Sequence, residues 1–216
     1  MFIAENLNNI KSQLPAHVTL VAVSKTKPVA DLMEAYNAGQ RIFGENKIQE
    51  MTDKWEVMPK DIEWHMIGHV QTNKVKYMAP YVSLIHGVDS LKLLQEINKQ
   101  AAKNNRVIDC LLQVYIAEEE SKFGLDKQEL EDILSSTEFK QLKNIRIVGL
   151  MGMATFTENK NQIEKEFKHL KTIFDKLKTQ NSELKTLSMG MSGDYQLAIS
   201  CGSTMVRIGS SIFGSR

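Results

Sequence analysis

One lysine stands where a buried strand is expected to end. Lys25 closes the apolar run Val18–Ser24, and Pro28 follows almost at once. At the mouth of a low-dielectric pocket, desolvation disfavours the charged form of a lysine, and the neutral amine can then attack an aldehyde to form a Schiff base. Most lysines that follow a strand are simply solvated. Lys25 by itself therefore gives a first hypothesis, a carbonyl-binding lysine with pyridoxal 5′-phosphate (PLP) as the obvious partner.

Two turns rich in Gly and Ser follow the last two predicted strands. The first, Ser188–Asp194, brings the hydroxyl of Ser192 and free backbone amides to the start of a helix. The second, Arg207–Ser211, contains Gly209, which lets an anion approach the backbone, and Ser210 and Ser211, which add donors. Each turn alone is more often a helix cap or a tight turn. Together they predict a cradle for a phosphate dianion.

Further polar side chains lie in or after the predicted strands. Arg207 stands inside the last apolar run and needs a partner there, either an acidic side chain or a cofactor ring or phosphate. Asn46 follows the second run and either bonds a ring substituent or caps the next helix. His86 lies in the fourth run and either lies against a planar ligand or is an ordinary core histidine. His65 and His69 have no third ligand at a suitable spacing, so no metal site is expected.

These side chains need a scaffold, and the apolar pattern predicts one. Short, near-continuous apolar runs rich in β-branched residues are typical of parallel strands that are buried on both faces. Eight such runs are found, Val18–Ser24, Arg41–Gly44, Glu63–Gly68, Leu84–Val88, Ile108–Ile116, Ile145–Met151, Thr186–Met189 and Met205–Ile208.

Helical patterns separate these runs. An initial helix is expected from about Phe2 to Gln13, and Ser90 is expected to cap a later helix. That later helix has an apolar face made by Leu91, Leu94, Ile97 and Ala101. A longer helix is predicted by apolar residues at spacings of three and four, and this stripe is expected to be core rather than a partner-binding seam. The stripe consists of Ile163, Phe167, Leu170, Phe174 and Leu177.

The order of the elements favours a barrel. Eight strand-then-helix units, an extra N-terminal helix and no Pro/Gly/Ser-rich linker predict a single (β/α)8 TIM barrel domain over residues 1–216. A doubly wound open sheet is the competing architecture, but it would favour a Gly-rich turn after the first strand, and Ser24–Pro28 has no glycine. Because the carboxyl ends of all barrel strands meet on one face, the polar side chains above are expected to lie together.

Composition limits the classes of function. Lys and Arg number 27 and Asp and Glu 26, so no bulk positive field favours nucleic acid or an acidic membrane surface. Cys110 and Cys201 have no metal-ligand spacing, no signal peptide pattern precedes them, and no apolar stretch is long enough to span a bilayer. The Ser-nucleophile elbow and the Gly-Lys phosphate loop of hydrolases are both missing. We expect a cytoplasmic protein without nucleic-acid or membrane partners.

Taken together, the segments at the predicted strand ends resemble the pyridoxal phosphate homeostasis proteins. The matching segments run in order along essentially the whole chain and are Ala22–Pro28, Phe43–Asn46, Trp64–Gly68, Gly149–Met151, Leu187–Ser192 and Gly202–Gly209. Two positions depart from the family. His69 stands where many members have proline, and Ser210 stands where some carry threonine, which preserves the hydroxyl.

The resemblance implies a barrel similar to the N-terminal domain of alanine racemase, with PLP held as a Schiff base on Lys25. It implies that Ser192, Gly209 and Ser210 hold the phosphate and that Arg207 faces the pyridine nitrogen or its surroundings. The full set of implied cofactor-binding residues is Lys25, Asn46, His65, Met153, Ser192, Arg207, Gly209 and Ser210.

The family is regarded as a carrier or regulator of the free PLP pool that affects vitamin B6 and amino-acid balance, without an established catalytic activity. A racemase needs a second base, which in alanine racemase is a tyrosine from a C-terminal β domain, and this chain is expected to lack that domain because it stops at Arg216. An arginine beside the pyridine nitrogen would also weaken the ring as an electron sink. The resemblance thus implies a PLP-homeostasis protein that is not an enzyme, and we expect a monomer with apo PLP-dependent enzymes as partners.

Two other functions remain open from the residues. The chain could be a PLP-dependent amino-acid racemase or lyase whose site is completed by a partner subunit. It could also be a barrel enzyme for phosphorylated sugars in which Lys25 forms a Schiff base with the substrate.

Overall fold

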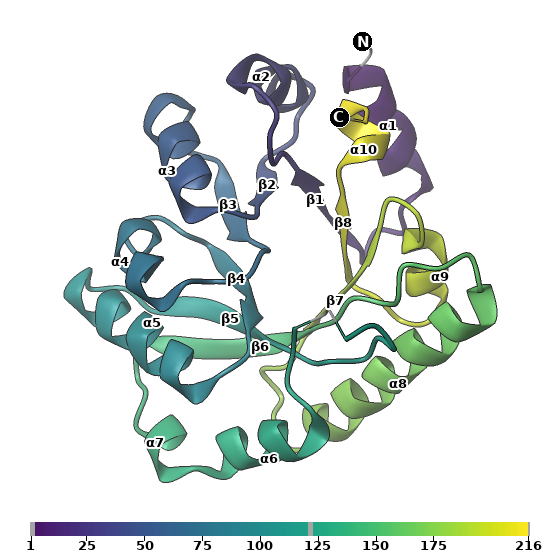
Figure 1. The fold of residues 1–216 in the computed structure, drawn as a ribbon. Coiled ribbons are helices and arrows are strands. Elements are labelled where there is room, and N and C mark those ends of the chain that lie inside the picture. Colours follow the sequence, from purple (N-terminus) through teal and green to yellow (C-terminus); the bar gives the residue numbers. More distant parts are fainter. Residues whose placement is uncertain (1–2, 121–122, 216) are drawn as a thin grey trace.

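A computed structural model describes residues 3–120 and 123–215. Eight parallel strands close into a barrel in sequence order, with β1 beside β8 (Figure 1). This confirms the predicted (β/α)8 barrel and excludes the open sheet. The strands are β1 Thr19–Val23, β2 Ile42–Glu45, β3 Glu63–Met66, β4 Leu84–Val88, β5 Ile108–Gln113, β6 Ile145–Met151, β7 Thr186–Met191 and β8 Met205–Ile208.

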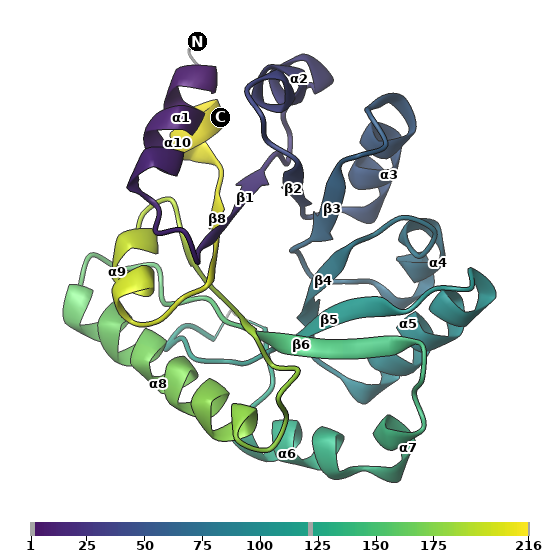
Figure 2. The same cartoon turned by 180° about the vertical axis from the view of Figure 1, so that it is seen from behind.

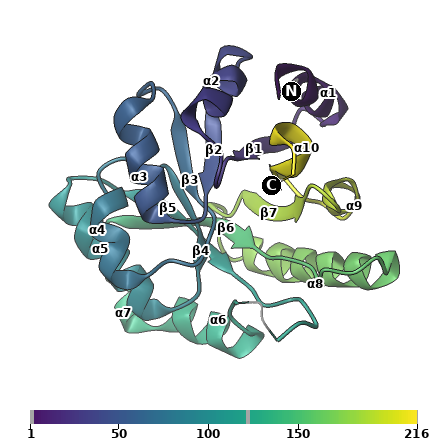
Figure 3. The same cartoon turned by 45° about the horizontal axis from the view of Figure 1, so that its top comes forward.

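Helices surround the strands, as Figure 3 shows. None of the helices in the described part of the chain is both long enough and apolar enough to cross a membrane. Phe2, with which the predicted first helix began, lies outside the described residues. The helices are α1 Ile3–Gln13, α2 Val29–Asn37, α3 Ile48–Val57, the 3-10 turn η1 Thr72–Lys74, α4 Val75–Met78, α5 Leu91–Lys103, α6 Lys127–Ser135, α7 Thr137–Lys140, α8 Lys160–Lys178, α9 Tyr195–Ser200 and α10 Ser210–Phe213.

Four strands differ in length from the prediction, and two of them, β1 and β3, are each two residues shorter than predicted. The run predicted to end at Ile116 leaves the barrel after Gln113, because Val114 instead forms an isolated bridge with Leu125. The strand predicted to end at Met189 continues to Met191. Gly190 has a φ of 102° within β7, where the pairing with β8 also shifts register, so this glycine is a local irregularity in the strand rather than its end.

The barrel has two apolar layers. The outer layer lies between the strands and the helices and includes Phe43, Trp64 and Phe167, all fully buried. The predicted stripe of α8 packs into it, and the Ser90 side chain accepts a hydrogen bond from Leu93 N at 3.1 Å, which confirms the predicted cap. The inner layer joins side chains of five strands that can touch only across the barrel interior, Val21, Leu84, Leu111, Met151 and Met205.

The two ends of the chain meet on one side of the barrel. Helices α1 and α10 lie side by side in both Figure 1 and Figure 2, and the Asn6 side-chain amide donates to the Ile212 carbonyl at 3.1 Å. The Lys27 amine donates to the carbonyls of Phe213, Gly214 and Ser215 at 3.0–3.3 Å. These contacts attach the corner between β1 and α2 to the segment that follows β8.

Gly149 permits the close pairing of β6 and β7. It lies opposite Thr186, and a Cβ on Gly149 would come within 1.7 Å of the Thr186 carbonyl oxygen. We expect Gly149→Ala to lower the free energy of unfolding by about 3 kcal/mol, because strand backbones must separate to admit the methyl group. Chemical denaturation measures the change. Gly193→Ala is the matched control, since no described residue beyond its two chain neighbours has an atom within 4 Å of the added Cβ. Equal losses in both variants would contradict the account.

Candidate functional site

The amines of three lysines at the corner between β1 and α2 differ in their partners. The Lys27 amine is bound to three carbonyls, as described above. The Lys54 amine, which comes from α3, donates to Ser24 O at 2.8 Å, Glu45 Oε1 at 2.6 Å and Glu50 Oε1 at 2.8 Å. An ammonium has three N–H groups, so both amines are fully engaged.

Lys25 is different. Its side chain is half-buried, and its amine makes no hydrogen bond or ion pair with any residue that the structure describes. Of the three amines at this corner, the Lys25 amine is therefore the one left available for an added group. This is the property that a carbonyl-binding lysine requires.

A chain of buried polar side chains crosses the barrel interior at Arg207. One guanidinium N–H of Arg207 donates to Ser188 Oγ, and another donates to the Gly152 carbonyl at 3.3 Å. Ser188 Oγ lies 3.0 Å from His86 Nδ1, and His86 Nε2 lies 3.0 Å from His65 Nδ1. The four side chains come from β8, β7, β4 and β3, and all are buried. Arg207 thus points into the barrel rather than into the outer helical layer.

These groups allow one continuous series of hydrogen bonds from Arg207 to His65, with the direction of the two histidine bonds set by the tautomers. Ser188 Oγ accepts from Arg207, so its own hydrogen can be donated to His86 Nδ1, and His86 Nε2–H then donates to His65 Nδ1. Burial lowers the pKa of Arg207 to about 10, with the charge of Asp194 opposing this shift, so the guanidinium remains cationic at neutral pH. The Arg207 guanidinium is therefore a fixed cation whose hydrogen-bond partners, Ser188 and the Gly152 carbonyl, are neutral.

The two histidines of this hydrogen-bonded series, His65 and His86, are neutral near pH 7. Burial lowers the pKa of His65 from 6.5 to about 3. Burial, followed by the neighbouring His65 and Arg207, lowers the pKa of His86 well below 6.5. The unfolded chain therefore takes up protons as the pH falls below 6.5, whereas the folded chain does not, and stability is lost across the range from pH 6.5 towards pH 3.

We expect the free energy of unfolding to be about 2 kcal/mol lower at pH 5 than at pH 7.5 because of His65 alone. Denaturant titrations at the two pH values measure this loss. In His65→Asn the loss should shrink by that amount, while in His17→Asn, which changes an exposed histidine, it should not. The same pH dependence in wild type and His65→Asn would show that His65 is not buried in its neutral form.

The loops after β7 and β8 meet beside the end of β1. Gly209 N donates to Ser192 Oγ at 3.2 Å, which joins the two loops. A Cβ on Gly209 would lie 3.1 Å from the Val23 carbonyl, two residues before Lys25, so there is little room there for a side chain. The first amides of α10, on Ser210 and Ser211, have no acceptor within the helix. Hydroxyls and amides are thus gathered close to the corner that carries Lys25.

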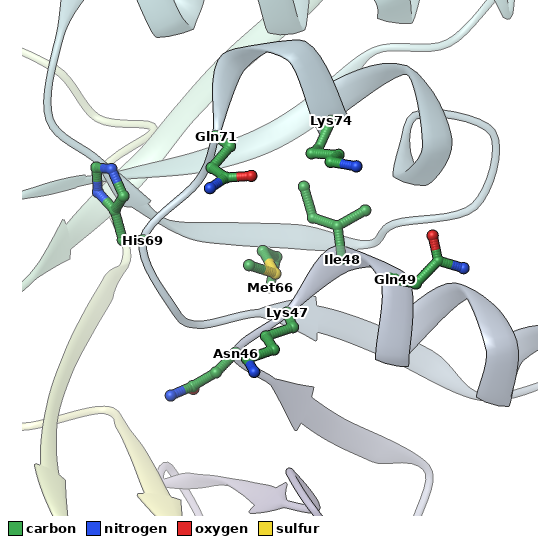
Figure 4. A pocket seen from close by; sticks show the side chains of 8 residues that line it. All are labelled: Asn46, Lys47, Ile48, Gln49, Met66, His69, Gln71 and Lys74. Atoms are coloured by element: carbon green, nitrogen blue, oxygen red, sulfur yellow. The ribbon is translucent and has the colours of Figure 1, made fainter.

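Asn46 follows β2 at the same end of the barrel. Together with Met66 and His69 it lines a cavity of about 290 Å³, which also has two basic residues, Lys47 and Lys74. Figure 4 shows the Asn46 side chain pointing away from the Ile48 and Gln49 side chains of α3.

The remaining predicted site residues lie in or just after the strands. Met153 follows β6, is half-buried and packs against the inner layer of the barrel. His65 lies inside the barrel and lines a cavity of about 510 Å³ at the opposite mouth, where the first residues of several strands, such as Glu63 and Thr186, also lie. Most of the predicted residues therefore lie at the carboxyl ends of the strands. His65 does not, and it is connected to that end by its hydrogen bond to His86, which is in turn bonded to Ser188.

Some residues around this site were not foreseen as part of it. Ser188 was noted only as the start of a turn, and its contact with Arg207 joins strands β7 and β8. Glu45 and Lys54 form a buried ion pair next to Ser24, although no role was predicted for either. The available signal was a charged residue at a position where the surrounding pattern predicts burial, which usually requires a partner.

Comparisons with known proteins show the family and the fold of this chain. A family model described as "Alanine racemase, N-terminal domain" matches residues 2–216. The "Pyridoxal phosphate homeostasis protein" of Aquifex aeolicus is 42% identical over 199 residues, which cover 91% of this chain and 86% of the relative. The structure of PipY of Synechococcus elongatus with PLP bound is 37% identical, with a TM-score of 0.89 over 98% of this chain and 100% of that one.

A more distant structure shows the fold alone. An alanine racemase of Clostridium difficile superposes with a TM-score of 0.81 at 17% identity. The match covers 99% of this chain but 56% of the racemase.

Proposed function

Because this chain belongs to the pyridoxal phosphate homeostasis proteins and, by its family model, to the alanine racemase N-terminal domain family, we propose that it binds PLP at the carboxyl ends of the barrel strands. In this proposal Lys25 holds PLP as a Schiff base. The chain acts as a binding protein in the homeostasis of PLP, and thereby of vitamin B6 and amino acids, rather than as an enzyme.

The observation that carries the proposal is that the Lys25 amine has no partner among the described residues, whereas the amines of the nearby Lys27 and Lys54 each make three hydrogen bonds. PLP, when bound, supplies an aldehyde. Lys25 would be the residue that holds this aldehyde as a Schiff base, with the aldehyde oxygen released as water. The bonds made by Lys27 and Lys54 hold those amines back from the same reaction and thereby favour Lys25.

The donor set near Lys25 fits the remainder of PLP. The Ser192 and Ser210 hydroxyls and the backbone that begins at Gly209 would hold the phosphate, since hydroxyls and the first amides of α10 are suitable donors to an anion. Arg207 would present its guanidinium to the pyridine nitrogen, with Asn46 and Met153 beside the ring. We also propose that His65 helps to position Arg207, through the series of hydrogen bonds that runs from His65 to Arg207.

The absence of catalysis is inferred from Arg207 and from the relatives. A guanidinium has donors only and stays protonated, so beside the pyridine nitrogen it would keep that nitrogen unprotonated. Such a ring stabilises a carbanion poorly. The relatives with high identity are named for PLP homeostasis. We propose that the chain works as a cytoplasmic monomer and passes PLP to apo PLP-dependent enzymes.

Transfer and turnover assays separate this function from the racemase or lyase alternative. We expect the PLP-loaded protein to activate an apo PLP-dependent enzyme with at most one PLP transferred per chain. We expect no steady conversion of L- or D-amino acids. Multiple turnovers of an amino acid that disappear in Lys25→Ala would establish an enzyme instead.

A further inference from the structure

Three charged side chains, Glu45, Glu50 and Lys54, form a network of ion pairs next to the backbone that carries Lys25. Glu45, at the end of β2, is fully buried, and the Lys54 side chain is 7% exposed. Burial raises the pKa of the Glu45 carboxyl, and the charge and hydrogen bond of Lys54 oppose that rise. Glu50, one turn before Lys54 on α3, is the outer member of the network, with a side chain that is 24% exposed.

The network binds the backbone on both sides of Lys25. Lys54 donates to the carbonyl of Ser24, the residue before Lys25, at 2.8 Å. Glu50 accepts from the amide of Thr26, the residue after Lys25, at 2.6 Å. The Ser24 hydroxyl also donates to Glu45 at 2.6 Å. The two peptide groups flanking Lys25 are therefore both held by side chains of α3, and Glu45 of β2 holds the Ser24 hydroxyl.

The backbone at this corner needs such restraint. Thr26 has a φ of 63°, in the left-handed region, which is strained for a β-branched residue. A strained conformation persists only where the surrounding structure enforces it, and such positions cluster at functional sites. The bond from Thr26 N to Glu50 Oε1 supplies this restraint here.

Stability alone gives a weak reason for these charges. Replacing a buried ion pair by apolar side chains of similar size is often neutral or stabilising. Each charged member of this network instead has a hydrogen bond with Ser24 or Thr26. Glu45 and Lys54 bind Ser24, and Glu50 binds Thr26.

We propose that Lys54 is a positioning residue for Lys25: together with Glu45 and Glu50 it fixes the strained corner at Ser24 and Thr26, and so aims the Lys25 amine at the incoming aldehyde. This rests on the proposed function of Lys25. Lys54 itself does not touch the cofactor. It acts by holding the backbone and by occupying its own three N–H groups.

The test uses Lys54→Met, which keeps much of the apolar stem but removes the amine, and Glu50→Ala, which removes the acceptor of Thr26 N at a partly exposed position. PLP affinity is measured by absorbance titration. In the same proteins without PLP, amide hydrogen exchange is measured at Thr26. We expect both variants to lower the affinity about tenfold, the effect of losing one charge-assisted hydrogen bond, and to raise the exchange rate of Thr26 at least as much.

Two controls isolate the restraint. Glu50→Gln keeps the Oε1 acceptor and should behave nearly as wild type, and Lys92→Met changes an exposed lysine on α5. Unchanged Thr26 exchange and unchanged affinity in Glu50→Ala would overturn the proposal, whether or not Lys54→Met folds. Failure of wild type to bind PLP at Lys25 would instead reject the proposed function, and the exchange measurement would still decide whether the network holds the corner.

Discussion

Lys25→Ala is expected to abolish covalent retention of PLP. The substitution removes the one amine at the corner between β1 and α2 that is free of partners among the described residues. Without it no C=N bond can form there, and only noncovalent contacts to the phosphate and ring remain. Titration with PLP should give no absorption band of a Schiff base, and borohydride treatment should leave no adduct on the protein.

Lys27→Ala is the control for this variant. Its amine is two residues away, but it is bound to the carbonyls of Phe213, Gly214 and Ser215 and is expected to take no part in the reaction. Lys27→Ala should therefore retain the band and the adduct. If Lys25→Ala still formed the adduct at wild-type yield, the assignment of the covalent site would be wrong.

Arg207→Gln is expected to cause the second largest loss. Glutamine can still reach Ser188 or Gly152 with one amide, but it lacks the buried charge and the planar set of donors. Losing a hydrogen bond from a charged group amounts to about 1.5–3 kcal/mol, so PLP affinity should fall by about 10-fold to 150-fold. Absorbance titration at several protein concentrations measures the change.

Two comparisons separate a role at the ring from a general effect on the fold. Arg146→Gln alters an exposed arginine that pairs with Asp109 at the other mouth of the barrel, and it should leave PLP affinity unchanged. Pyridoxal, which lacks the phosphate, should lose affinity for Arg207→Gln by a factor similar to that of PLP. If only PLP binding fell, Arg207 would act on the phosphate rather than on the ring.

The fold could be predicted because its signals are local. Each strand is a short apolar run, and the α8 stripe repeats at a helical period, so neither depends on distant partners. The errors arose where a local signal had a non-local cause. Gly190 resembles a turn residue, yet β7 continues through it because pairing with β8 resumes at Met191.

The arrangement of the candidate site could be predicted only for residues that stand at strand ends. Lys25, Asn46, Ser192 and Gly209 stand after strands, and barrel topology alone brings such residues together. The contacts behind them depend on the register between strands. His86 and Ser188 are 102 positions apart in the chain, and the pairing of Lys54 with Ser24 requires α3 to lie against the end of β1. No spacing along the sequence marks either contact.

The most direct test of the central claim is to locate the trapped cofactor on the wild-type protein. The protein is loaded with one equivalent of PLP, reduced with borohydride and digested, and the peptides are mapped by mass spectrometry. The account predicts a single modified lysine, Lys25. Modification of Lys27 or Lys54, a spread over exposed lysines, or no modified lysine at all would contradict it.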